Sequence, residues 1–197
     1  MFNKRFVNYL LCVIACLLPA QAVFASSLAD YAPFIHKKAQ FYQGDGQFYY
    51  QRNMILEFKP DANGIYQVTS YNQANEASAY VYQLNDDGLY ELAVFPQYHE
   101  VQDLRYSAEA QDAVKSIVLP TELTADVTYS SGYQQEFKRT IVGVIDTCTI
   151  DNHHYQNVLV VKQESDSGTL MYYFAPQTGL ILTTDEQGNP LEILIEK

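Results

Sequence analysis

Residues 170–197 read LMYYFAPQTGLILTTDEQGNPLEILIEK, and their pattern decides the fold of the chain. Three apolar stretches are separated by the turn signals PQTG and DEQGNP. In the last stretch, Leu191, Ile193 and Ile195 alternate with polar residues, which is typical of a strand covered on one side and wet on the other. The pattern predicts antiparallel strands and places the last stretch at the final edge of a curved sheet, not in a membrane anchor.

The same period-two alternation runs through most of the chain and is interrupted by Gly, Asn, Asp and Pro. The stretches FYYQRNMILEF (48–58) and IYQVTSYN (65–72) are joined by the turn DANG, and the strands at 78–84 and 89–95 by the turn NDDG. Further strands are expected at 124–130, 133–146, 155–164, 169–175, 179–184 and 190–196.

Two segments depart from this alternation. Ser107 is a candidate N-cap for a short helix from Ala108 to Ile117, and residues 27–42 form either a short helix or an extended strand with a break at Pro33. The chain is therefore expected to be mainly β. It would form one strongly curved antiparallel sheet or a half-open β-barrel of roughly ten strands, with one or two short helices.

Residues 1–25 have the features of a secretory signal peptide. Lys4 and Arg5 precede a short apolar stretch, and small residues follow it at Ala22 and Ala25. The apolar stretch is shorter than the span of about 20 residues that a membrane helix needs. We expect cleavage after Ala25, with Ala22 as the near alternative, and a protein that is exported to the periplasm or the extracellular space.

The cysteines allow a second processing route. The sequence VIAC ends at Cys16 and resembles a lipoprotein box, in which Cys16 would become acylated and tether the protein to a membrane. Either route leaves Cys148 as the only free thiol of the processed chain, so no intramolecular disulfide is expected. Residues 26–197 are expected to form a single antiparallel β domain, with Cys148 as a buried small hydrophobe.

The charge of the chain bears on its partners. The formal net charge is −11, and removal of the basic leader makes the remaining chain still more acidic. Nucleic acid and anionic membrane surfaces are therefore not expected as primary partners, because both need basic patches.

No motif in the chain fixes an activity. Nucleophile elbows, P-loops, dinucleotide fingerprints and HExxH zinc motifs do not occur. His153 and His154 are adjacent, so in a strand they would point to opposite faces, whereas in a turn they could converge with Asp151. Asp185 and Glu186 could do acid–base work but occupy a turn signal, where carboxylates are normally solvated. No metal, no cofactor and no catalytic residue is expected.

The aromatic content suggests where a ligand could bind. The chain has 17 Tyr and 10 Phe but no Trp, and tyrosine suits half-buried strands whose hydroxyl reaches water or a partner. Ordinary sheet packing explains most of these residues. If the concave face binds a ligand, the expected lining residues are Phe48, Tyr50, Met54, Phe58, Tyr80, Tyr82, Tyr172 and Phe174.

Several segments resemble a family of exported bacterial domains of unknown function. They are PFIHKKAQFYQGDGQFYYQRNMILEF followed by DANGIYQVTSY in the first half, and NVLVVK, YYFAPQTGLI and LEILI in the second. The resemblance implies a curved antiparallel sheet, loosely similar in shape to the periplasmic lipoprotein-localisation carriers. The family carries no agreed catalytic residues.

Three hypotheses of function follow from the expected shape. The first is a non-catalytic cell-envelope protein that binds an apolar or lipid-like ligand, or a segment of a partner protein, on the concave face of the sheet. The second is a structural or protein-interaction module whose core is fully packed. The third is a hydrolase of envelope polymers that uses His153, His154 or Asp185.

Overall fold

The structure is a computed structural model that describes residues 27–32, 37–42, 48–72, 74, 76–112, 114–150 and 152–196. The expected signal peptide with its cleavage sites, the lipidation site Cys16, and Asp151 lie outside the described residues. Within the described part of the chain, no helix is both long and apolar enough to cross a membrane.

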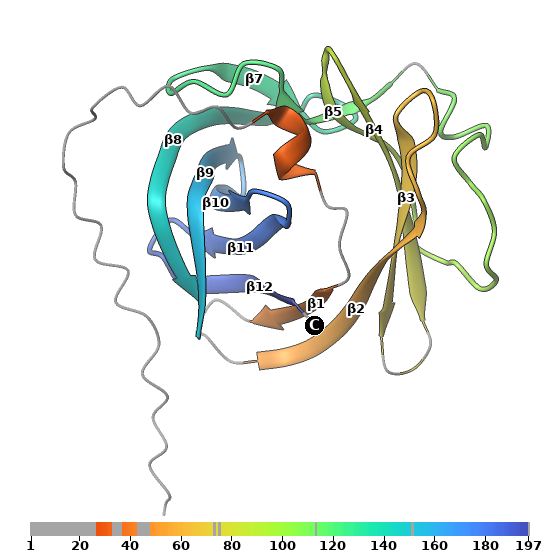
Figure 1. Ribbon diagram of the computed structural model, residues 1–197, viewed down its shortest axis with the longest axis horizontal. Coiled ribbons are helices and arrows are strands. Elements are labelled where there is room, and N and C mark those ends of the chain that lie inside the picture. The colour runs from red at the N-terminus through yellow and green to blue at the C-terminus, as the bar shows by residue number, and fades with distance from the viewer. Residues whose placement is uncertain are drawn as a thin grey trace, which may run out of the picture.

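The described residues form a mainly β fold, as predicted, with twelve antiparallel strands in one curved sheet (Figure 1). The elements are η1 (a 3₁₀ turn, Leu28–Tyr31), β1 (Lys37–Tyr42), β2 (Phe48–Phe58), β3 (Ile65–Asn72), β4 (Ala77–Asn85), β5 (Gly88–Phe95), β6 (Ser116–Pro120), β7 (Thr128–Ser131), β8 (Phe137–Ile150), β9 (His153–Ser165), β10 (Gly168–Ala175), β11 (Gly179–Asp185) and β12 (Pro190–Glu196).

The strand order is β6-β5-β4-β3-β2-β1-β12-β11-β10-β9-β8-β7. The sheet has two arms, β1–β6 and β7–β12, and within each arm every strand pairs with the strand next to it in the sequence. The pairing of β1 with β12 joins the two arms. The arms curve towards one another (Figure 1), so that β7 comes to lie beside β6, the other edge of the sheet. The prediction that residues 190–196 form the final edge was wrong, because β1 covers that edge of β12. Ile193 and Leu194 are both buried, so this strand is covered on both faces at that point.

The two segments without alternation also differ from expectation. Residues 27–42 contain both of the predicted structures, a short helical turn (η1) and then an extended strand (β1). The predicted helix over 108–117 is wrong: Ser107 starts a single turn, in which its Oγ accepts a hydrogen bond from the Ala110 backbone N–H at 3.1 Å. The turn cannot continue as a helix because β6 begins at Ser116 and pairs with β5. The strands β1 and β6 account for the two strands beyond the expected ten.

The convex face of β3–β5 is covered by the segment 96–115. Small and aliphatic residues such as Ala79, Val81 and Leu92 pack there against Tyr98 and Leu104 of the segment. Polar contacts hold the cover in place: Gln67 accepts a hydrogen bond from the Leu104 N–H, and the carboxylate of Glu57 accepts one from the Tyr98 hydroxyl at 2.7 Å. This segment therefore seals the outside of one arm.

A buried cluster lies on the concave face, where residues of both arms meet. Its fully or nearly buried members are Tyr31, Tyr66, Val68, Leu89, Leu119, Ile141, Leu159, Val161 and Phe174. Leu28 of η1 packs against this cluster, and the Tyr31 hydroxyl donates to the Asn157 carbonyl oxygen at 3.1 Å, so η1 is fixed against the inside of the sheet. A second cluster around Cys148, which is buried as predicted, joins the distal part of β8–β9 to β11 and β12.

Candidate functional site

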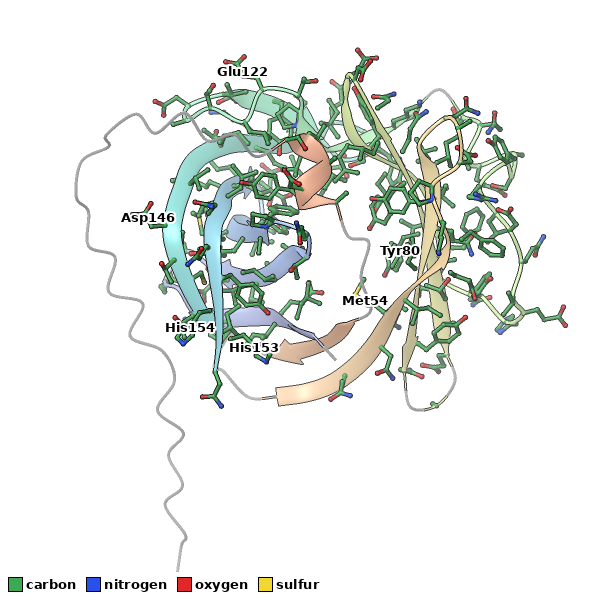
Figure 2. The ribbon with its side chains drawn as sticks, viewed as in Figure 1. Met54, Tyr80, Glu122, Asp146, His153 and His154 are labelled. Atoms are coloured by element: carbon green, nitrogen blue, oxygen red, sulfur yellow. The ribbon has the colours of Figure 1, made fainter. Side chains whose placement is uncertain are left out.

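The concave face brings together five of the eight predicted lining residues. Phe174 is buried in the central cluster, and Met54, Tyr82 and Tyr172 pack against it while remaining half-buried. Tyr80 stacks on Tyr82 with 6.4 Å between the ring centroids. Met54 and Tyr80 point into the space that the curved sheet encloses (Figure 2). These side chains share one face because each strand keeps its alternation up to these positions.

Phe58 lies on the other face. The pairing of β2 with β3 shifts between Leu56, which is opposite Val68, and Phe58, which is opposite Gln67. This bulge inserts one residue and turns the end of β2 outwards. The guanidinium of Arg105, in the covering segment, lies 5.5 Å from the centre of the Phe58 ring. Phe48 and Tyr50 belong to β2, but their side chains lie outside the described residues.

Arg139 is the functional candidate of the concave face that the sequence reading missed. In the ladder it is opposite Gln163, whose Oε1 accepts from Arg139 Nε at 2.8 Å. Its guanidinium carbon lies 4.9 Å from the centre of the Tyr172 ring, and its Nη1 donates to the carbonyl oxygens of Ile117 and Val118 at 3.3 Å each. In KRTIVGV, strand parity puts Arg139 on the same face as the buried Ile141, but it does not show which groups surround the charge.

Further polar groups line the same face. Arg52 Nη1 donates to Ser78 Oγ at 3.1 Å. The Glu91 carboxylate accepts from the Tyr133 hydroxyl at 3.1 Å, and burial raises the pKa of Glu91 although Tyr133, Tyr82 and Arg139 oppose this. Burial also raises the pKa of the Tyr82 hydroxyl well above its ordinary value. The face is thus an aromatic surface that carries a few charged or hydrogen-bonding groups.

The sheet is not closed at the edges β6 and β7, where side chains take the place of a backbone ladder. Ser131 Oγ donates to the Ile117 carbonyl oxygen at 2.7 Å, and the Tyr129 hydroxyl donates to that of Val118 at 2.9 Å. Ser116 Oγ lies 3.4 Å from Ser131 Oγ. We call this junction the seam.

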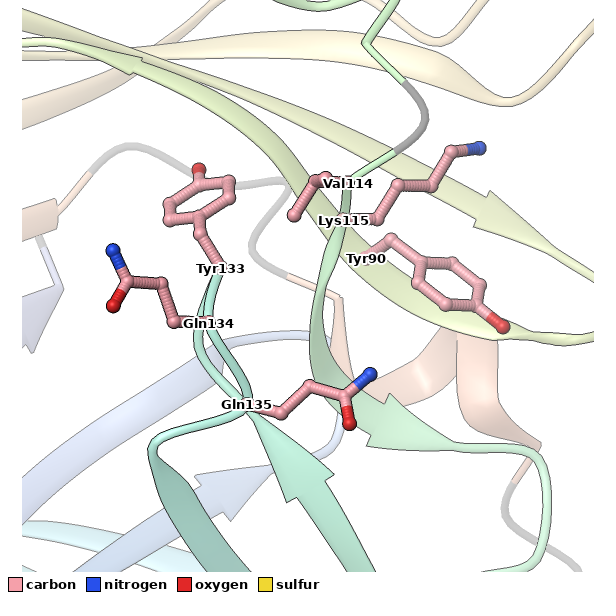
Figure 3. A pocket seen from close by; sticks show the side chains of 6 residues that line it. All are labelled: Tyr90, Val114, Lys115, Tyr133, Gln134 and Gln135. Atoms are coloured by element: carbon pink, nitrogen blue, oxygen red, sulfur yellow. The ribbon is translucent and has the colours of Figure 1, made fainter.

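An open pocket of about 460 Å³ lies at one end of the seam (Figure 3). Val114 and Lys115, which precede β6, face Tyr133 and Gln134 of the β7–β8 turn across it. The Lys115 ammonium lies 5.7 Å from the centre of the Tyr90 ring and donates to Gln83 Oε1. The pocket is polar and shallow, and it lies outside the concave face.

The residues considered for hydrolysis do not converge. His153 and His154 are exposed at the start of β9, opposite Ile150 and Thr149, and therefore point to opposite faces. Asp185 is opposite Leu170 of β10, and Leu170 is opposite Gln163 of β9. Since a strand rises roughly 3.3 Å per residue, the separation between positions 163 and 153 of β9 puts Asp185 about 30 Å from His153 along the sheet. Its carboxylate accepts two hydrogen bonds from Asn189 at 2.8 Å. Among the described residues, no group of three or more His, Cys, Asp or Glu could hold a metal ion.

Comparison with known proteins adds one structural likeness. No family model matches the chain, and no curated protein matches its sequence. Among solved structures, a Bacteroides fragilis protein presumed to be exported, with a YmcC-like fold, superposes with a TM-score of 0.50 at 9% sequence identity. The match covers 85% of this chain and 97% of that protein. At this identity the likeness concerns the fold alone.

Proposed function

We propose that this protein is an exported, non-catalytic binding protein of the cell envelope that holds an apolar, lipid-like guest on the concave face of its sheet. The observation that supports the proposal is the partial exposure of large apolar side chains there. Met54, Leu56, Tyr82, Leu84 and Tyr172 all pack against the central cluster yet stay half-buried. Their exposed parts leave apolar surface that a guest on this face would cover.

The neighbouring exposed apolar surface points the same way. Val94 is opposite Tyr80 in the β4–β5 ladder, so the two side chains share the concave face, and Val94 is 37% exposed. Binding an elongated apolar molecule would remove this surface from water, which stabilises a complex by about 25 cal/mol per Å² of apolar area before the costs of association.

Displacement of the neutral dye Nile red by decanol from the purified protein tests the proposal. We expect saturable displacement, and native mass spectrometry of protein from envelope extracts should show bound lipid. Met54→Trp, which fills the concave face, should weaken decanol binding at least about tenfold. Val142→Trp is the matched control, because Val142 is 50% exposed on β8. Absence of binding by the unaltered protein would sink the proposal.

A second candidate is a structural or protein-interaction module with a packed core. It is favoured by the full burial of Tyr66, Leu89, Ile141 and Leu159 in the centre of the concave cluster. A stoichiometric protein partner recovered from envelope extracts, with no lipid bound, would support this candidate instead.

Export is proposed from the leader-like residues 1–25. Mass spectrometry of the N-terminus of the processed protein tests it. A chain that starts at Ser26 or Val23 indicates a released protein of the periplasm or the extracellular space, and an acylated Cys16 indicates a tethered one.

A further inference from the structure

Arg139 forms no ion pair with a carboxylate of the described residues, although Glu91 interacts with its charge at longer range. The side chain of Arg139 is half-buried. Its hydrogen-bond acceptors are the amide oxygen of Gln163 and the backbone carbonyls of Ile117 and Val118, all of them neutral. A charge that is withdrawn from water is normally paired, because its desolvation is costly. The arrangement therefore leaves a place for an anion beside the guanidinium.

The surroundings of Arg139 suit the acid group of an amphipathic molecule. Tyr172, over which the guanidinium lies, belongs to the apolar concave surface, so a chain lying on that surface ends next to the charge. Two acidic side chains, Glu91 and Glu192, face the same interior, and neither forms an ion pair with Arg139. The nearby Tyr129 hydroxyl already donates to the Val118 carbonyl oxygen, so the guanidinium of Arg139 is the group that would bind the acid.

We infer that the guest is an anionic amphiphile, such as a long-chain carboxylic acid, and that Arg139 binds its acid group while the hydrocarbon chain lies along Met54, Tyr82 and Tyr172. This inference rests on the proposed function and specifies the chemistry of its ligand. Nε and Nη1 of Arg139 already donate, and Nη2 has no acceptor among the hydrogen bonds of the described residues. The planar guanidinium presents Nη2 beside Nη1 in a fork that suits a carboxylate, which favours Arg over Lys at such a position.

Decanoate and decanol, which share a chain and differ in charge, separate the inference from the proposed function. Each is used to displace Nile red at pH 8. The unaltered protein should bind decanoate at least about tenfold more tightly than decanol, because a hydrogen bond to a charged group contributes that much. Arg139→Gln should bring the two affinities within about twofold and leave decanol binding unchanged. Arg139→Lys keeps the charge and should restore part of the preference.

Lys138→Gln is the matched control. Lys138 is the neighbour of Arg139 in β8, its side chain is 64% exposed, and its removal changes the net charge by the same amount. The preference for decanoate should survive this change. Equal binding of decanoate and decanol by the unaltered protein, or a preference that persists in Arg139→Gln, overturns the inference but leaves the proposed function standing. If neither ligand binds the unaltered protein, the proposed function is wrong and the inference falls with it. Retained decanol binding shows that Arg139→Gln is folded.

Discussion

The carboxylate of Glu57 should be one of the largest single polar contributions to the stability of the fold. It accepts hydrogen bonds from Thr69 Oγ1 at 2.5 Å, Tyr98 Oη at 2.7 Å, Tyr71 Oη at 2.9 Å and Gln67 Nε2 at 3.1 Å. Gln67, Thr69 and Tyr98 are buried, so donors that lose this acceptor cannot all turn to water. Replacement of Glu57 by Ala is therefore expected to destabilise the convex side of β2–β3 and its cover.

The size of the destabilisation by Glu57→Ala depends on which of the four donors have a second acceptor. Gln67 Nε2 and Tyr98 Oη both also reach the Gln102 carbonyl oxygen, at 3.1 and 3.0 Å. Apart from a contact with one another, Thr69 and Tyr71 have no second acceptor among the hydrogen bonds of the described residues. Two hydrogen bonds to a charged group at roughly 1.5 kcal/mol each give a loss of about 3 kcal/mol in the free energy of unfolding for Glu57→Ala. That is a large part of the 5–15 kcal/mol typical of a domain.

Urea unfolding measures this loss, with tyrosine fluorescence and circular dichroism as the two probes, because the chain has no Trp. Glu57→Gln is the control. Its amide oxygen can replace the carboxylate oxygen that receives three of the donors, and the Tyr71 hydroxyl can rotate to accept from the new amide group, so the cost should be about 1 kcal/mol. A loss below about 1 kcal/mol for Glu57→Ala, or equal losses for the two variants, would refute the reasoning.

Three further predictions concern ionisation and turn geometry. Burial raises the pKa of Glu91 above its ordinary 4.5. Between the two pKa values the folded protein therefore holds a proton on Glu91 that the unfolded protein has lost. The free energy of unfolding should fall as the pH rises from 4.5 through the raised pKa. Glu91→Gln should raise the Tm at pH 8 and leave it nearly unchanged at pH 4; a constant difference across this range contradicts the assignment. At Gly64, with φ +72°, an added Cβ would lie 1.9 Å from a β4 carbonyl oxygen, whereas at Gly188, with φ +85°, it meets nothing within 4 Å. Gly64→Ala should therefore cost more than about 3 kcal/mol in urea unfolding and Gly188→Ala about 1 kcal/mol, and similar costs would show that the contact is not the cause. Burial raises the pKa of Tyr66 and Tyr82 well above 10. Absorbance at 295 nm should therefore show fewer tyrosinates in the folded protein at pH 11 than in the urea-unfolded protein at the same pH. Equal absorbance of the two would contradict this burial.

Local sequence patterns determined the strands well where each turn carries its own signal. The strands at 48–58 and 65–72 begin and end as predicted, since DANG between them supplies Gly64 with a positive φ. The strand expected from 133 starts instead at Phe137, because residues 132–136 form a turn in which Gly132 and Gln135 have positive φ. A glutamine in the left-handed region gives no turn signal in the sequence.

Features that depend on pairing between distant parts of the chain were not predictable. The bulge that moves Phe58 to the convex face is set by the register against β3, not by the alternation within β2. The position of β12 in the middle of the sheet depends on β1, more than 150 residues away in the sequence. Arg139 was missed because a charge on an apolar face gains meaning only when its neighbours are known, and these come from β6, β9 and β10.

The topology would link the inferred binding of an acid at Arg139 to access to the concave face. All strand pairs except β1–β12 join neighbours in the sequence, and β1–β12 is held by a backbone ladder from Lys37–Glu196 to Phe41–Glu192. The seam has no such ladder, so it should open at a lower cost than any strand pair, at about 1 kcal/mol for each side-chain hydrogen bond that is lost. Arg139 contributes two of these bonds and also faces the proposed guest. A carboxylate that binds Nη2 and Nη1 together would compete with the two seam carbonyls for Nη1. Binding of the guest and loosening of the seam would then be coupled through one side chain.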